Sequence, residues 1–144
     1  MRVVEAIEER FEDLHSMTVA ILCGKGNNGG DGMVIARQLL QRNVTPFVFL
    51  FASENEVRGD AKVQLDILRA IGAPPTIITS EADWNEEKLE VTDADIVVDA
   101  LLGTGLTKPL AGLYRSVIES LPDDFPGATI VSVDLPSGLV ADSG

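Results

Sequence analysis

The chain has 144 residues, a length typical of one domain, and 45% of them are hydrophobic, which supplies enough apolar side chains for a buried core. Its net charge of −12 repels nucleic-acid backbones and anionic lipid surfaces, so neither nucleic acid nor membrane is predicted as a partner. One cysteine and one histidine exclude an intrachain disulfide and a zinc site built from these two residue types.

The first segment, residues 3–14, carries apolar residues at helical spacing with charged residues between them. This pattern predicts an amphipathic helix and is unlike a secretory signal peptide. Because no apolar run in the chain approaches the roughly 20 residues of a membrane helix, we expect a cytoplasmic protein.

Strand and helix patterns alternate through the rest of the chain. Continuous apolar runs predict strands at 18–23, 45–51, 75–80, 95–102 and 128–135. Helical spacing predicts helices at 33–42, 57–71 and 113–121, the last two ended by Gly72 and Pro122, whereas the acidic segment 81–90 is predicted to be a solvated loop. This alternation predicts a Rossmann-like, mostly parallel sheet in a three-layer α/β/α sandwich.

A glycine-rich segment, GKGNNGGDG at residues 24–32, follows the first predicted strand. It matches the G-x-G-x-x-G dinucleotide pattern in its required strand-to-helix context. Its five glycines permit positive φ and a close approach of backbone to a ligand, and its two asparagines offer amide groups. Asp31 is predicted to cap a helix that begins near Gly32. We predict a ligand-binding loop; the alternative is a glycine-rich turn without a ligand.

Two further predicted strands end in an aspartate. Asp99 closes the fourth strand ahead of Gly103 and Gly105, and Asp134 closes the fifth ahead of a Pro-Ser-Gly turn. The carboxyl ends of parallel strands meet at one edge of the sheet, where such folds bind ligands. Capping of their own loops is the alternative role of both aspartates. All the candidate ligands are oxygens, which favours a group-one or group-two cation over a transition metal.

The motifs GKGNNGGDG, VDALLGTGL and VDLPSGLVADSG, in this order, resemble the YjeF N-terminal domain, the NAD(P)H-hydrate epimerase family. The resemblance spans nearly the whole chain and implies a single domain over residues 1–144. That domain is expected to be incomplete at its C-terminus, because the family continues past the ADSG-like motif.

The resemblance implies an enzyme that interconverts the R and S forms of the hydrated cofactors NADHX and NADPHX, without deciding which is preferred. It implies K⁺ as cofactor, held by Asn28, Asp99 and Ser137, and Asp134 as the acid/base group. The implied substrate-binding residues are Asn27, Asn28, Gly29, Gly30, Asp31, Gly103, Thr104, Gly105, Leu106, Thr107, Lys108, Pro109 and Asp134. Lys108 stands near where the family commonly has an arginine. The implied functional partner is a dehydratase for the S form, fused C-terminally in many bacteria, and a homodimer is a candidate assembly.

Two other functions stay open at this stage. The same fold occurs in mRNA-decapping enhancer proteins, which implies a non-catalytic scaffold as one alternative. An ordinary NAD-dependent dehydrogenase is the other. It requires an acidic residue at the end of the second strand, whereas this strand ends in Phe51-Ala52-Ser53 and Glu54 arrives late.

Overall fold

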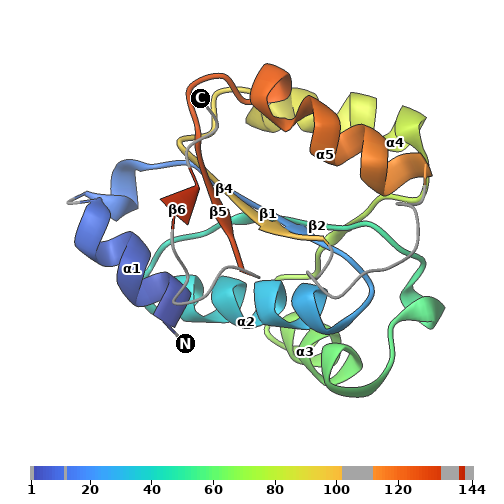
Figure 1. The fold of residues 1–144 in the computed structure, drawn as a ribbon. Helices are drawn as coiled ribbons and strands as arrows, with labels where there is room; N and C mark the ends of the chain where they lie inside the picture. Colours follow the sequence, from blue (N-terminus) through green and yellow to red (C-terminus); the bar gives the residue numbers. More distant parts are fainter. Residues whose placement is uncertain (1, 12, 102–111, 134–139, 142–144) are drawn as a thin grey trace.

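A parallel sheet forms the centre of the protein (Figure 1). The computed structural model describes residues 2–11, 13–101, 112–133 and 140–141. Within these, the strands lie in the order β3-β2-β1-β4-β5-β6, and β6 alone pairs antiparallel, at the edge next to β5. The strands are β1 (Val19–Cys23), β2 (Phe47–Leu50), β3 (Thr76–Ile77), β4 (Ile96–Ala100), β5 (Thr129–Ser132) and β6 (Val140–Ala141). The prediction of a mostly parallel sheet is confirmed.

Helices cover both faces of this sheet (Figure 1). On one face lie α1 (Arg2–Arg10), α2 (Asn27–Gln41) and α3 (Gly59–Ala70), and on the other lie α4 (Glu81–Glu87) and α5 (Gly112–Asp124). Short 3₁₀ helices span Leu14–Ser16, Glu54–Glu56 and Lys88–Val91. The predicted three-layer α/β/α sandwich is therefore confirmed.

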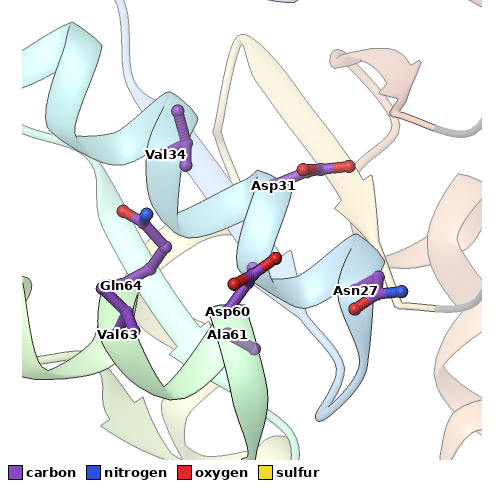
Figure 2. Close-up of a pocket in the computed structure, with 8 residues that line it drawn as sticks. Asn27, Asp31, Val34, Asp60, Ala61, Val63 and Gln64 are labelled. Atoms are coloured by element: carbon purple, nitrogen blue, oxygen red, sulfur yellow. The ribbon is translucent and has the colours of Figure 1, made fainter.

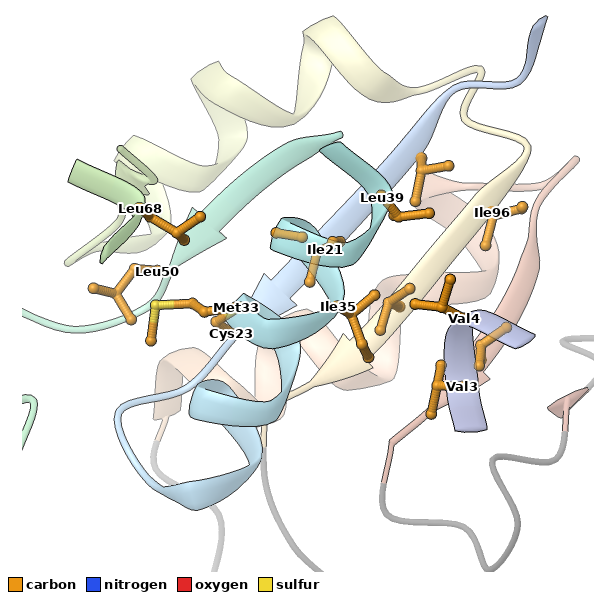
Figure 3. Close-up of a cluster of buried hydrophobic side chains, with 14 of the residues drawn as sticks. Val3, Val4, Ile21, Cys23, Met33, Ile35, Leu39, Leu50, Leu68 and Ile96 are labelled. Atoms are coloured by element: carbon orange, nitrogen blue, oxygen red, sulfur yellow. The ribbon is translucent and has the colours of Figure 1, made fainter. Parts of the chain in front are cut away.

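Each face of the sheet has its own apolar core. Every residue of β1 is buried, as expected for a central strand whose apolar run is covered on both sides. Figure 3 shows the core under α1 and α2, where Ile21 of β1 packs with Met33 and Leu39 of α2. On the opposite face Trp84 makes edge-to-face contacts with Phe49 and Phe51, with ring centroids 5.2 and 5.1 Å apart.

The start of α2 differs from the sequence prediction. The helix begins at Asn27 with Gly26 as its N-cap, six residues before the predicted start at residue 33. Asp31 therefore lies inside the helix, and the prediction that it caps the helix is wrong. Tertiary packing extends the helix, because Gly29, Gly30 and Gly32 are all buried against neighbouring elements and so stabilise helical backbone in a segment of low helix propensity.

Two other segments were predicted wrongly. The acidic segment 81–90 forms α4 and a 3₁₀ turn instead of a solvated loop, since Ser80 Oγ accepts a hydrogen bond from Asp83 N–H at 3.1 Å and the Trp84 side chain is only 3% exposed. In the second case α5 continues through Pro122 to Asp124, so Pro122 does not end it. Burial of Leu121 and Phe125 holds that last turn in place. Among the described helices, none is long and apolar enough to span a bilayer.

Candidate functional site

The sequence order of the strands reverses between β1 and β4, which are hydrogen-bonded neighbours in the centre of the sheet. Ligands of doubly wound sheets bind at such a switch point, beyond the carboxyl ends of the strands. Here the Gly24 N–H donates a hydrogen bond to the Ala100 carbonyl at 2.9 Å, which joins the two strand ends. The glycine-rich segment after β1 and Asp99 at the end of β4 therefore lie at one edge, as predicted.

The glycines of this segment serve packing. A Cβ on Gly29 would lie 1.7 Å from the Gly24 carbonyl oxygen, and one on Gly24 would lie 2.1 Å from the Leu101 carbonyl oxygen. Gly26 alone among the five has no atom within 4 Å of the place that a Cβ would occupy. Among the described glycines positive φ occurs only at Gly59 and Gly72, so the segment 24–32 does not use the positive φ that its glycines permit. Close approach of α2 to the ends of β1 and β4 explains Gly24, Gly29 and Gly32, and contact with Ala61 of α3 explains Gly30.

Asn28 places an unsatisfied polar group at this edge. Its Nδ2 atom is buried and has no hydrogen-bond partner among the described residues. The assignment of N and O in a side-chain amide follows from its partners, and exchanging the two would put an acceptor oxygen at the buried position. A buried amide without a partner costs free energy that a ligand would recover. Within the segment, Asn28 is therefore the residue whose side chain would gain most from a hydrogen bond or ion contact with a ligand.

Asp99 is half-buried at the end of β4, where it pairs in register with Leu22 of β1 and Ser132 of β5. Its Oδ1 accepts a hydrogen bond from the Leu101 N–H at 3.2 Å, so the alternative role of capping its own loop is observed. A carboxylate can accept further contacts on its remaining lone pairs. An amide oxygen from Asn28 and a carboxylate from Asp99 are the donor types that hard cations take, so these residues fit a K⁺ ion.

Asn27 and Asp31 line a cleft between α2 and α3, of about 340 Å³ (Figure 2). Asp60 and Gln64 of α3 form its other wall. Burial raises the pKa of the Asp31 carboxyl above its usual value. Asp31 and Asp60 make this cleft acidic, so it suits polar hydroxyl or amide groups better than phosphates.

The site residues predicted from the sequence divide into two groups. Asn27, Asn28, Gly29, Gly30 and Asp31 come together on the first turns of α2, and Asp99 lies at the adjacent strand end. The other predicted residues lie outside the described part of the chain: Gly103, Thr104, Gly105, Leu106, Thr107, Lys108, Pro109, Asp134 and Ser137. Within the described ranges no group of three or more His, Cys, Asp and Glu side chains is placed to hold a metal.

Neither Cys23 nor His15 belongs to the site. Cys23 is fully buried, and burial raises the pKa of its thiol to about 12, so it is not a nucleophile at neutral pH. His15 is exposed, and its Nε2 pairs with the Arg42 carbonyl at 2.8 Å, remote in sequence from every strand end of the site.

A second cavity was missed by the sequence prediction. It has a volume of about 300 Å³ and lies at the carboxyl ends of β1, β2 and β3, against the start of α5. Lys25, Glu56 and Tyr114 supply its polar groups. The Ser53-x-x-Glu56 spacing of a capping box was the available signal, since that pattern fixes a glutamate just beyond the second strand.

The chain is similar in sequence and in fold to known proteins. A family model described as YjeF-related protein N-terminus matches residues 1–144. The chain is 41% identical to the bifunctional NAD(P)H-hydrate repair enzyme Nnr of Moorella thermoacetica, over 100% of this chain and 27% of that protein. It is 38% identical to the NAD(P)H-hydrate epimerase of Rhodobacter capsulatus, over 98% of this chain and 64% of that protein. The crystal structure of yeast YNL200c matches with a TM-score of 0.75 and 29% identity, over 99% of this chain and 60% of that chain. The chain thus spans between about a quarter and two thirds of these relatives.

Proposed function

This chain belongs to the family of YjeF-related protein N-termini, and we propose that it epimerises hydrated nicotinamide cofactors, interconverting the R and S forms of NADHX and NADPHX. Relatives named NAD(P)H-hydrate epimerase support this proposal, at 40% and 38% identity over most of the chain. The structural observation that carries it is Asn28 on the first turn of α2, whose buried Nδ2 has no hydrogen-bond partner among the described residues. A plain packing role for the segment 24–32 leaves that amide unexplained.

We infer that K⁺ is held by Asn28 and Asp99, with Ser137 as a third ligand. When bound, the ion supplies positive charge at the sheet edge, which holds a carboxylate ionised and attracts an anionic substrate. The half-buried position of Asp99 supports the inference, because a partly desolvated carboxylate is stabilised by a neighbouring cation.

The chemistry asks for one group that gives and takes back a proton. The epimerised carbon bears a hydroxyl and the ring nitrogen, so inversion proceeds by reversible C–O cleavage or by ring opening, with return to the opposite face. In C–O cleavage the hydroxyl oxygen gains a proton and leaves as water, and water that returns to the opposite face loses that proton again. In ring opening the C–N bond breaks as the hydroxyl loses its proton to become a carbonyl and the departing nitrogen gains one, and closure reverses both transfers. We propose Asp134 for this role and Asn27 and Asp31 for orienting the substrate. The loop 103–109 is proposed to hold the substrate phosphates.

Incubation of the chain with purified R-NADHX tests the proposal. Chromatographic separation of the two forms follows the approach to equilibrium against the spontaneous rate in buffer. We expect a catalysed approach to the same R/S mixture from either form, lost in Asp134→Asn while its circular dichroism spectrum is unchanged. A rate no faster than buffer would refute the function, and parent activity in the folded Asp134→Asn variant would refute only the assignment of Asp134.

We further propose that the functional partner is a dehydratase that consumes the S form. Relatives from Moorella thermoacetica, Thermofilum pendens and Salinibacter ruber are named bifunctional repair enzymes, and the chain covers 24 to 27% of each. The word bifunctional in these names is explained if each protein joins an epimerase domain to a dehydratase domain. With an S-specific dehydratase alone, repair of R-NADHX is expected to be limited by the spontaneous rate of epimerisation, and addition of this chain is expected to raise the rate above that limit.

A further inference from the structure

The cavity between the ends of β2 and β3 and the start of α5 borders the glycine-rich segment. Lys25 belongs both to the glycine-rich segment and to the cavity wall. Tyr114 of α5 donates a hydrogen bond from its hydroxyl to the Phe51 carbonyl at 2.7 Å, which fixes α5 to the end of β2. Burial raises the pKa of Tyr114, and the nearby backbone N–H of Lys25 opposes that rise, so the phenol lies against the segment after β1 as well.

The size of the cavity matches part of a dinucleotide. Ligand pockets in proteins span roughly 300–1,000 Å³, and this cavity, at about 300 Å³, lies at the lower limit. It can therefore take one nucleoside but not two. A dinucleotide with one half here would reach the switch point between β1 and β4 with the other.

The polar groups of the cavity suit a ribose. Glu56 lies on the short 3₁₀ helix Glu54–Glu56 that follows β2, further along the chain than the strand-end acidic residue that binds ribose hydroxyls in doubly wound dinucleotide-binding sheets. It nevertheless faces the cavity at the same edge of the sheet. Its Oε1 accepts a hydrogen bond from the Ser53 N–H at 3.0 Å, and its Oε2 lies 3.5 Å from Lys25 Nζ. The Ser53 bond, reinforced by Lys25, lowers the pKa of the Glu56 carboxyl, so it is an ionised acceptor. The half-buried Leu113 and Tyr114 side chains of α5 provide apolar surface for a base.

We propose that this cavity is the adenosine subsite of the epimerase site. In it Glu56 accepts hydrogen bonds from unmodified ribose and Lys25 receives a ribose 2′-phosphate, so the Lys25–Glu56 pair sets the preference between NADHX and NADPHX. The inference rests on the proposed function, which supplies the other half of the substrate, the hydrated nicotinamide. Lys25 is the single cation among the described residues of this cavity, in a chain of net charge −12, so it is the group on which a 2′-phosphate depends.

The test uses two nucleotides that differ only at the ribose, AMP and adenosine 2′,5′-bisphosphate, with the full chain. Affinity is measured by calorimetry, and the place of binding by chemical-shift changes of backbone amides. Lys25→Met is expected to weaken bisphosphate binding about three- to tenfold and AMP binding less than twofold, because an exposed charge contributes modestly. Glu56→Gln keeps an acceptor for Ser53 N–H and is expected to shift the ratio of the two affinities toward the bisphosphate.

Lys62→Met is the matched control. Lys62 pairs with Asp66 on the surface of α3 at 2.6 Å, with exposure similar to that of Lys25, and does not line the cavity. It is expected to leave both affinities unchanged. The ratio of KM for NADPHX to KM for NADHX is expected to rise in Lys25→Met and to fall in Glu56→Gln.

Amide shifts at Ser53, Thr79 and Leu113 would support the subsite, and shifts confined to the cleft between α2 and α3 would overturn it. Equal effects of Lys25→Met on both nucleotides would overturn the role of Lys25. If the chain epimerised NADHX but bound neither nucleotide at millimolar concentration, the subsite would be refuted and the proposed function would stand. If it bound both in this cavity but did not epimerise, the subsite would be supported and the proposed function would fail.

Discussion

Gly29→Ala is a substitution whose effect the structure defines sharply. A methyl group at this position would lie 1.7 Å from the Gly24 carbonyl oxygen, whereas ordinary contacts begin at 3.4 Å. The obstructing atoms belong to the backbone at the end of β1, which is tied to β4 through the Gly24–Ala100 hydrogen bond. They cannot rotate away as a side chain would. Relief therefore requires a displacement of α2 from the sheet.

The expected magnitude follows from two opposing terms. Alanine gains about 1 kcal/mol over glycine from helix propensity inside α2. Overpacking typically costs about 1–3 kcal/mol and more where the surroundings are rigid, so we expect net destabilisation of about 2 kcal/mol or more. Gly26→Ala is the matched control, because no atom lies within 4 Å of its added methyl group. As an N-cap substitution it is expected to cost less than about 1 kcal/mol.

Urea unfolding followed by the fluorescence of Trp84, the single tryptophan, measures both variants. With a urea dependence of about 2 kcal/mol per molar for a domain of this size, Gly29→Ala should lower the midpoint by about 1 M or more. Gly26→Ala should shift it by clearly less. Equal midpoints for the two variants would show that packing at the end of β1 is not the reason for glycine in this segment.

Three other experiments test the burial of particular side chains. Burial raises the pKa of the Asp31 carboxyl in the folded state, so its negative charge disfavours folding at pH values above its unfolded pKa of about 3.8. Asp31→Asn should therefore raise the thermal midpoint at pH 7 and lose this stability advantage as the pH falls below that value, and it should lower epimerase activity. A lower thermal midpoint at pH 7 would contradict this. Cys23, with its thiol pKa raised to about 12, should react with a thiol reagent only at the rate of unfolding, and fast labelling of the native chain would contradict its burial. Trp84→Ala should destabilise the fold by about 3–5 kcal/mol in urea unfolding followed by circular dichroism, and a loss below about 1 kcal/mol would show that its contacts with Phe49 and Phe51 are not part of the core.

Much of the fold could be predicted from the sequence because its parallel strands are buried on both faces. The apolar run of β1 and the Gly72 end of α3, where φ is +80°, are local signals that the structure confirms. Tertiary contacts decided the rest. The start of α2 depends on contacts of Gly29 and Gly32 with β1 and β4, and α4 depends on Trp84 reaching Phe49 and Phe51. Neither contact has a counterpart in local periodicity.

The site was predictable to the extent that it follows strand ends. The segment that carries Asn28 follows β1 and Asp99 lies at the end of β4, so both lie at one edge because β1 and β4 are parallel neighbours, a consequence of the alternating pattern. Four of the five glycines serve close packing, Gly26 has open space, and none has positive φ. That the segment binds a ligand stays a prediction. Glu56 was missed because its place depends on the turn after β2, which brings it to Lys25 across 31 residues of sequence. The roles of Asp134, Ser137 and the segment 103–109 stay predictions.

The K⁺ dependence of R-NADHX conversion, measured for the parent chain and for Asp99→Asn, tests whether a cation held at the sheet edge supports epimerisation. In buffer free of alkali cations other than Li⁺, added K⁺ is expected to raise the rate for the parent chain, and Asp99→Asn, still folded, is expected to require a much higher K⁺ concentration. Conversion by the parent chain that is independent of K⁺, or identical K⁺ titrations for the two proteins, would contradict a cation held by Asn28 and Asp99. An absence of conversion at every K⁺ concentration would contradict the epimerase function itself.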